Sequence, residues 1–223
     1  MLNNPFNSSP SIVIPMEALQ TAGGLVMREA NHLAFPFVSF EKSQIGVRVG
    51  NMTRPLVVSI IVGAAGQNRI GAQIAQCVMA KLAQYAGVEV RLLEAPTLSS
   101  AALQQADAMI LVLPEYNYGF PNVLKNLLEK NLAAYAHRAV GICDLSPGWF
   151  GGARLLETLL PLMCKFGLAP IFWDANSAHG DDIFDAAGQF KDHVQCERVD
   201  NFLQELMWMA TALRQRREMA LPN

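Results

Sequence analysis

Hydrophobic residues follow two alternating patterns from Leu56 onward. Short, largely apolar runs rich in β-branched residues are typical of strands buried on both faces of a sheet. They occur at 56–63, 88–93, 108–113, 138–144 and 168–173. Between them, apolar residues recur about every four positions, as from Ile70 to Leu82, and this spacing predicts helices.

Strand and helix alternate five times in this order. Right-handed crossovers then predict an α/β fold with a doubly wound, five-stranded parallel sheet between two layers of helices. We expect Pro161 to interrupt the helix over 153–167, and we expect a short crossover helix, because the connection over 93–101 is brief. The last helix ends in Arg-Gln-Arg-Arg, which suits the negative end of its dipole.

Residues 1–53 differ from the rest, because they contain isolated apolar pieces and no persuasive helix. We interpret this part as an arm, an edge hairpin or a partly disordered extension. Residues 54–223 form the predicted domain.

Composition narrows the class of protein. The chain has 223 residues, is 52% hydrophobic and carries a formal net charge of −2, so it can bury a core and has no basic block for nucleic acid. Four widely spaced cysteines favour free thiols over disulfides. No stretch reaches the ~20 apolar residues of a membrane span. We therefore expect a cytoplasmic protein without membrane or nucleic-acid partners.

Three loops of unusual composition follow predicted strands, and all three should leave the same edge of the sheet, where ligands bind in such folds. In the first, 63–71, small residues allow an anion to approach free helical N–H groups, and Arg69 adds a charge-assisted contact. The glycine spacing fits neither a Walker A loop nor a dinucleotide fingerprint. The alternative is a tight turn with a surface arginine.

The second loop, 114–121, is bounded by two prolines that stiffen it. Tyr116 and Tyr118 offer flat apolar faces, and Asn117 can hydrogen-bond the edge of a heterocycle. The third loop, 146–152, places three glycines beside two aromatic residues and so permits close approach of a planar ligand. The alternative for both loops is aromatic packing within the protein or an interface.

No conventional catalytic or metal site is evident. No Ser-His-Asp or Cys-His arrangement has support, and His179, Asp181 and Asp182 have generic spacing that favours a polar loop. We predict no catalytic side chain and no bound metal.

Several motifs resemble those of the NADPH-dependent FMN reductase family, which includes flavin, quinone, azo-dye and chromate reductases. The segment PEYNYGFPNVLKNLLE is similar to the family signature, and GWFGGARLLETL, FDAAGQFKD and ELMWMATAL resemble later parts, so the resemblance covers 55–217. It implies a flavodoxin-like fold, FMN as cofactor, NADPH or NADH as electron donor, a small-molecule acceptor, and a homodimer or homotetramer.

The resemblance also assigns cofactor-binding residues. It implies that Arg69 and the backbone of the first loop bind the phosphate group of FMN. The second and third loops would then contact the isoalloxazine ring. The residues expected to bind FMN are Gly66, Gln67, Asn68, Arg69, Gly71, Pro114, Glu115, Tyr116, Asn117, Tyr118, Ser146, Gly148 and Gly151.

Three departures from the family pattern bear on activity. Ala64 and Gly66 stand where a hydroxyl and an arginine usually meet phosphate, the connection over 93–101 is short, and Gly119 replaces a serine. The predicted function is an FMN-dependent NAD(P)H oxidoreductase that reduces a quinone, flavin or similar acceptor. The alternative is a non-catalytic flavodoxin-like homologue with weakened FMN binding that acts as a binding or assembly protein.

Overall fold

The computed structural model describes residues 54–63, 69–95, 98–114, 119–146, 153–171, 177–178, 183–185 and 190–219. The predicted N-terminal extension lies outside the described residues. The elements in chain order are β1 (Leu56–Val62), α1 (Arg69–Leu82), β2 (Val88–Glu94), α2 (Ser100–Gln105), β3 (Ala108–Pro114), α3 (Asn122–Lys130), η3 (Leu132–Ala134), β4 (Arg138–Ser146), α4 (Ala153–Lys165), β5 (Leu168–Pro170), β6 (Ser177–Ala178) and α5 (His193–Met219).

The strands form one parallel sheet with the order β2-β1-β3-β4-β5, and β6 pairs with β4. The predicted doubly wound, five-stranded parallel sheet is thereby confirmed. The fifth strand is shorter than predicted and ends at Pro170, which has no N–H to donate to a sheet. The two-residue β6 was not predicted, because so short a strand leaves no periodic pattern.

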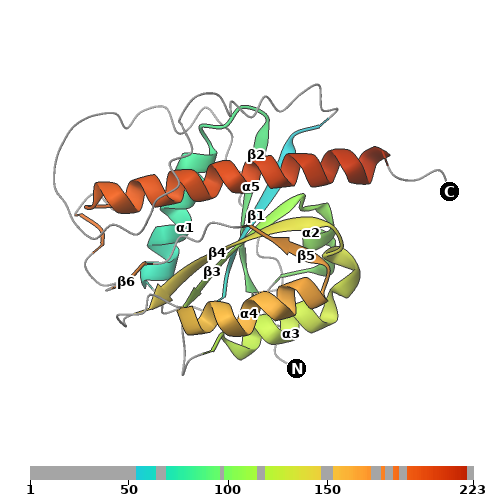
Figure 1. Ribbon diagram of the computed structural model, residues 1–223, viewed down its shortest axis with the longest axis horizontal. Coiled ribbons are helices and arrows are strands. Elements are labelled where there is room, and N and C mark those ends of the chain that lie inside the picture. Colours follow the sequence, from blue (N-terminus) through green and yellow to red (C-terminus); the bar gives the residue numbers. More distant parts are fainter. Residues whose placement is uncertain are drawn as a thin grey trace, which may run out of the picture.

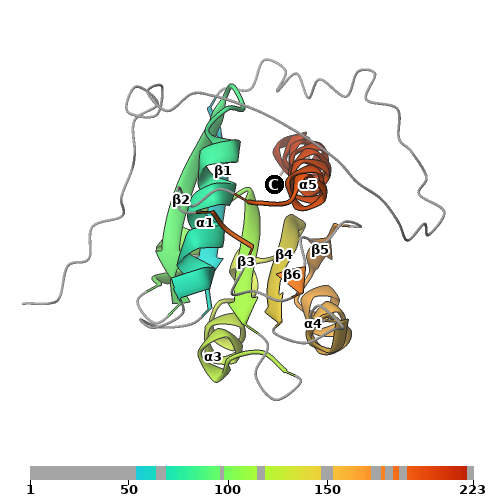
Figure 2. The same cartoon turned by 90° about the vertical axis from the view of Figure 1, so that its left-hand side faces the viewer.

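Helices cover both faces of the sheet, as Figures 1 and 2 show, with α1 and α5 on one side and α2, α3 and α4 on the other. Successive strand residues point to opposite faces, so β1 supplies both cores. Ile60 packs in the cluster with α1 and α5, and Ile61 packs in the cluster with α2, α3 and α4. Both side chains are almost fully buried.

Helix α4 runs without a break through Pro161, so the predicted interruption is wrong. Pro161 lies on the exposed side of the helix, where the carbonyl group it leaves unpaired can be hydrated. The crossover helix α2 has only six residues, as the short connection predicted.

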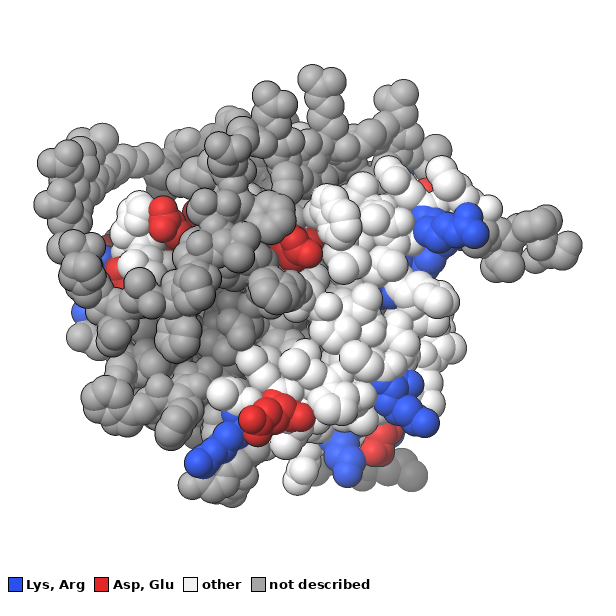
Figure 3. Space-filling model, in the orientation of Figure 1, with Lys and Arg blue, Asp and Glu red and all other residues white. Residues whose placement is uncertain are grey.

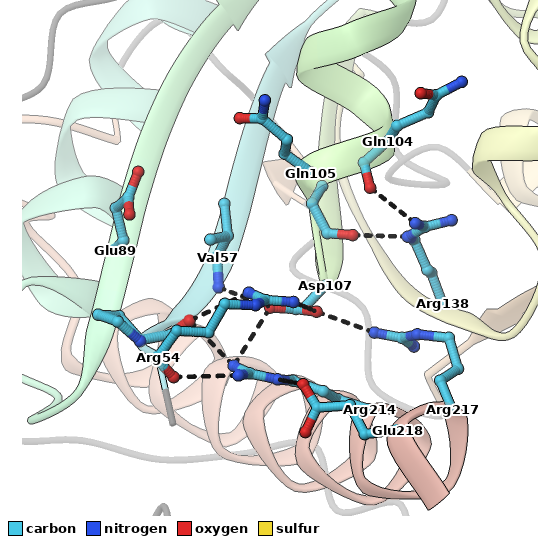
Figure 4. A network of polar contacts seen from close by, with 12 residues as sticks. Arg54, Val57, Glu89, Gln104, Gln105, Asp107, Arg138, Arg214, Arg217 and Glu218 are labelled. Atoms are coloured by element: carbon cyan, nitrogen blue, oxygen red, sulfur yellow. Dashed lines mark hydrogen bonds and ion pairs between the residues drawn. The ribbon is translucent and has the colours of Figure 1, made fainter. Parts of the chain in front are cut away.

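The carboxylate of Asp107, just before β3, holds the end of α5 against the start of β1 (Figure 4). Arg54 donates two hydrogen bonds to it, at 2.7 and 3.0 Å, and the backbone N–H of Val57 donates a third at 3.0 Å. From α5, Arg217 donates at 3.0 Å and Arg214 at 3.4 Å. Burial alone raises the pKa of Asp107, but the hydrogen bonds and arginine charges outweigh it and the pKa is lowered.

Arg214 completes the connection between α5 and β1. Its side chain is 1% exposed and donates to the carbonyl oxygens of Pro55 at 2.9 Å and Arg54 at 3.1 Å, while Glu218 accepts from its Nε at 2.8 Å. Arg214 and Arg217, at the end of the last helix, therefore do more than offset its dipole. They bind one buried carboxylate.

The described surface carries charges of both signs. In Figure 3, basic and acidic side chains are interspersed among uncharged ones, in keeping with the net charge of −2. No helix in the described part of the chain has the length and apolarity needed to cross a membrane.

Candidate functional site

The three predicted loops follow neighbouring strands and leave the sheet at one edge. Strands β1, β3 and β4 lie side by side and parallel, so their carboxyl ends point the same way (Figure 2). The loops at 64–68, 115–118 and 147–152 start directly from these ends. The chain order reverses at β1, which pairs with β2 on one side and β3 on the other. In parallel sheets this is the position at which ligands bind.

Most of the predicted FMN-binding residues lie outside the described part of the chain. These are Gly66, Gln67, Asn68, Glu115, Tyr116, Asn117, Tyr118, Gly148 and Gly151. Their contacts therefore stay predictions.

The remaining site residues mark where the loops begin and end. Arg69 is the first residue of α1, and Gly71 is buried in the first turn of that helix. Pro114 is the buried last residue of β3, and Ser146 is the last residue of β4. These four residues therefore lie at the carboxyl-terminal edge of the sheet, where the loops begin or end.

The start of α1 fits a phosphate group. The first turn contains no acidic residue that would repel an anion, and it begins at Arg69. Unpaired N–H groups and the helix dipole make such a terminus a favourable place for phosphate. This helix end could therefore hold the phosphate of FMN.

The end of β1 packs closely against β3 at Gly63. The N–H of Gly63, directly after β1, donates to the carbonyl of Val112 at 2.9 Å. A Cβ atom at Gly63 would lie 2.3 Å from Cδ2 of Leu113, a residue that is fully buried. A side chain at position 63 would therefore displace the buried Leu113 side chain, so glycine suits the close approach of β1 to β3.

The described residues contain no group of three His, Cys, Asp or Glu side chains that could hold a metal ion. The His179 and Asp181 segment lies outside them. A polar cluster that the sequence analysis did not predict surrounds Asp107 at the opposite edge of the sheet. An aspartate directly before a buried strand and the arginines at 214 and 217 are visible in the sequence, but no local pattern pairs them.

Comparison with known proteins shows a family resemblance over part of the chain. Residues 94–177 match the model of the family described as NADPH-dependent FMN reductase. The match confirms the resemblance to this family and includes the loops after β3 and β4. The first loop, with Ala64 and Gly66, precedes the matched segment. No curated protein is significantly similar to the sequence.

Solved structures confirm the flavodoxin-like fold. The flavoenzyme NAD(P)H:(acceptor) oxidoreductase FerB from Paracoccus denitrificans is 18% identical, with a TM-score of 0.58, over 70% of this chain and 97% of that one. The apo form of the NADH:FMN oxidoreductase EMOB is 14% identical, with a TM-score of 0.59, over 69% and 89%. A flavodoxin from Streptococcus pneumoniae TIGR4 is 16% identical, with a TM-score of 0.52, over 67% and 97%.

Proposed function

We propose that the protein is an FMN-dependent oxidoreductase that takes electrons from NADPH or NADH and reduces a small acceptor such as a quinone or a flavin. The observation that carries the proposal is that β1, β3 and β4, the strands from which the three loops start, end at one edge of the sheet that includes the β1/β3 switch point. Two of the loops lie within the segment that matches the reductase family. The names of FerB and EMOB describe the same kind of chemistry in proteins of this fold.

Each loop has a separate part in holding the cofactor. Arg69 and the N–H groups at the start of α1 bind the phosphate group, and residues 114–118 line the isoalloxazine ring. Ser146 and the glycines at 148 and 151 contact its third edge. The first two loops start from strand ends that lie close together, because β1 approaches β3 at Gly63.

Bound FMN would supply the hydride and electron chemistry of the reaction. The protein would orient the ring and leave one ring face accessible to the donor and the acceptor in turn. It would also limit the access of water to that face. This division explains why no catalytic acid or base is needed in the loops.

Anaerobic mixing of the FMN-loaded protein with NADPH or NADH tests the proposal. We expect the flavin absorbance to bleach, and to return when a quinone is added. A protein that binds FMN but leaves NADPH and NADH unoxidised with quinone and flavin acceptors would contradict the enzyme assignment. That result would favour the non-catalytic alternative.

Replacing Arg69 by alanine should weaken FMN binding by at least about tenfold, because a charge-assisted hydrogen bond to phosphate is lost. Riboflavin lacks the phosphate group, so its affinity should change little. Fluorescence titrations with both ligands measure the difference, and Arg216→Ala, at an exposed position on α5, is the matched control. An equal loss for both ligands would argue against a phosphate contact.

Replacing Asn117 by alanine should weaken FMN binding by about one hydrogen bond, ~0.5–1.5 kcal/mol, and slow NAD(P)H oxidation. The melting temperature without FMN should stay nearly unchanged. Tyr116→Leu should act in the same direction, while Asn126→Ala, at an exposed position on α3, should be silent. A fall in stability with unchanged flavin binding and turnover would show that the loop serves only the fold.

We also propose a homodimer or homotetramer, which light scattering at micromolar concentration checks. The region from Val123 to Leu132 contains five apolar residues, more than one contact with the sheet needs. Leu124, Leu127 and Leu128 are in fact buried against their own sheet, whereas Leu132 is 52% exposed. The packing of one chain therefore uses most of this band, and a monomer at that concentration would reject the oligomer.

A further inference from the structure

A cavity lies at the amino-terminal edge of the sheet, opposite the strand ends from which the three loops start. Its volume is about 370 Å³, within the range of ~300–1,000 Å³ found for small-molecule sites. The starts of β1, β2 and β4, the end of α2 and the end of α5 enclose it. The lining residues are Arg54, Pro55, Val57, Glu89, Arg91, Gln104, Gln105, Asp107, Arg138 and Arg217.

The lining carries more positive than negative charge. Four guanidinium groups face two carboxylates, which leaves an excess of two positive charges. Arg91 pairs with Glu89 at 2.7 Å, and Arg54 forms its double hydrogen bond with Asp107. Arg217 also pairs with Asp107, at 3.0 Å, so this single carboxylate binds several arginines.

Arg138 has no carboxylate partner among the described residues. Its Nε donates to the carbonyl oxygen of Ala106 at 2.6 Å, and its Nη2 donates to that of Gln104 at 2.8 Å (Figure 4). The carbonyl oxygen of Ala134 accepts from Nη1. These bonds fix the guanidinium group in the cavity wall without neutralising it.

The electrostatics favour an added anion. Burial lowers the pKa of Arg138, and the charge of Arg217 lowers it further. Burial also lowers the pKa of Arg217, with Arg54 and Arg214 adding to the effect against the opposing influence of Asp107. A dianion in the cavity would relieve this mutual repulsion.

We propose that this cavity binds the phosphate group of a small molecule. Planar, fixed guanidinium groups match the oxygens of phosphate in pairs, and Gln104 and Gln105 add polar groups on the wall formed by α2. The space exceeds what one phosphate needs, so a phosphate ester fits the site. The proposal is independent of the flavin chemistry at the opposite edge.

Calorimetric titration of the full chain with inorganic phosphate, at constant ionic strength, tests the proposal. We expect saturable binding with a dissociation constant of about 1 mM or below. Arg91→Gln removes a lining cation that pairs with Glu89 at 2.7 Å and donates to Gln105 at 2.5 Å, and it should weaken binding about tenfold. Glu89→Gln removes a lining carboxylate and should tighten it. Arg216→Gln removes the same charge from an exposed position on α5 and should change nothing.

Opposite effects of Arg91→Gln and Glu89→Gln separate a cavity site from general screening or partial unfolding. Equal losses in Arg91→Gln and Arg216→Gln, or no saturable binding, would overturn the proposal. So would a loss of phosphate binding confined to Arg69→Ala, because the phosphate would then sit at the start of α1. Titration with adenosine monophosphate distinguishes the two sources of the group: tighter binding than inorganic phosphate indicates an ester, and equal or weaker binding indicates the free ion.

Discussion

Replacing Asp107 by asparagine should lower the free energy of unfolding by about 3–5 kcal/mol, the cost of breaking a buried ion pair by removing one partner. Asp107 and Arg214 have side chains that are 3% and 1% exposed, so Arg214 would be left charged in the interior. Arg54 and Arg217 would lose the same acceptor. Urea denaturation followed by circular dichroism measures the change.

A matched control removes a carboxylate charge from an exposed ion pair, and so distinguishes the effect of burial from the effect of charge alone. Asp200 on α5 pairs with Lys81 at 2.5 Å, but its side chain is 49% exposed. Such pairs contribute ~0.2–1 kcal/mol, so Asp200→Asn should have a small effect. Similar small losses for both variants would mean that Asp107 does not anchor α5.

The Asp107 carboxylate should also make the free energy of unfolding fall at acid pH. Since the pKa of Asp107 is lower in the folded state than in the unfolded state, its contribution is complete above the unfolded value of about 4. It is lost as the pH falls below that value and through the folded pKa. Asp107→Asn should therefore make the stability less dependent on pH in this acid range, which urea denaturation at several pH values can check.

Replacing Gly141 by alanine should also be strongly destabilising, by about 1–3 kcal/mol. Gly141 lies in β4 beneath α5, and an added Cβ would lie 2.4 Å from Cζ and 2.6 Å from Cε2 of Phe202. The Phe202 ring is fully buried in the core between α5 and the sheet. Because a packed ring has little room to turn aside, α5 would have to move away from β4.

A double-mutant cycle identifies the clash as the cause. Phe202→Leu shortens the side chain, so Gly141→Ala should cost less in that background than in the wild type. Thermal or urea unfolding of the two single variants and the double variant gives the coupling. Purely additive losses would show that the two residues do not compete for the same space.

The sequence predicted the sheet well for a physical reason. Strands buried on both faces leave continuous apolar runs, and β1 and β3 are such strands, with nearly every residue buried. The position of the three loops followed from the topology, because carboxyl ends of neighbouring parallel strands meet at one edge. Their detailed contacts did not follow, because they depend on side chains that no local pattern orients.

Two features could not be predicted from local sequence patterns: polar contacts between distant residues, and a helix that continues through a proline. Asp107 and Arg214 are 107 positions apart, and nothing in the sequence around either one specifies the other. Pro161 gives a strong signal for a helix break, yet α4 accommodates it by placing it toward solvent. Both cases depend on packing between elements rather than on the pattern within one.

Titration with FMN, followed by quenching of flavin fluorescence, tests the central claim most directly. We expect saturation at one FMN per chain, weaker binding in Arg69→Ala and Asn117→Ala, and unchanged binding in Arg91→Gln, which alters the opposite edge of the sheet. Fluorescence that remains that of free FMN throughout the titration would contradict a flavin site at the β1/β3 switch point. So would binding that both loop substitutions leave intact.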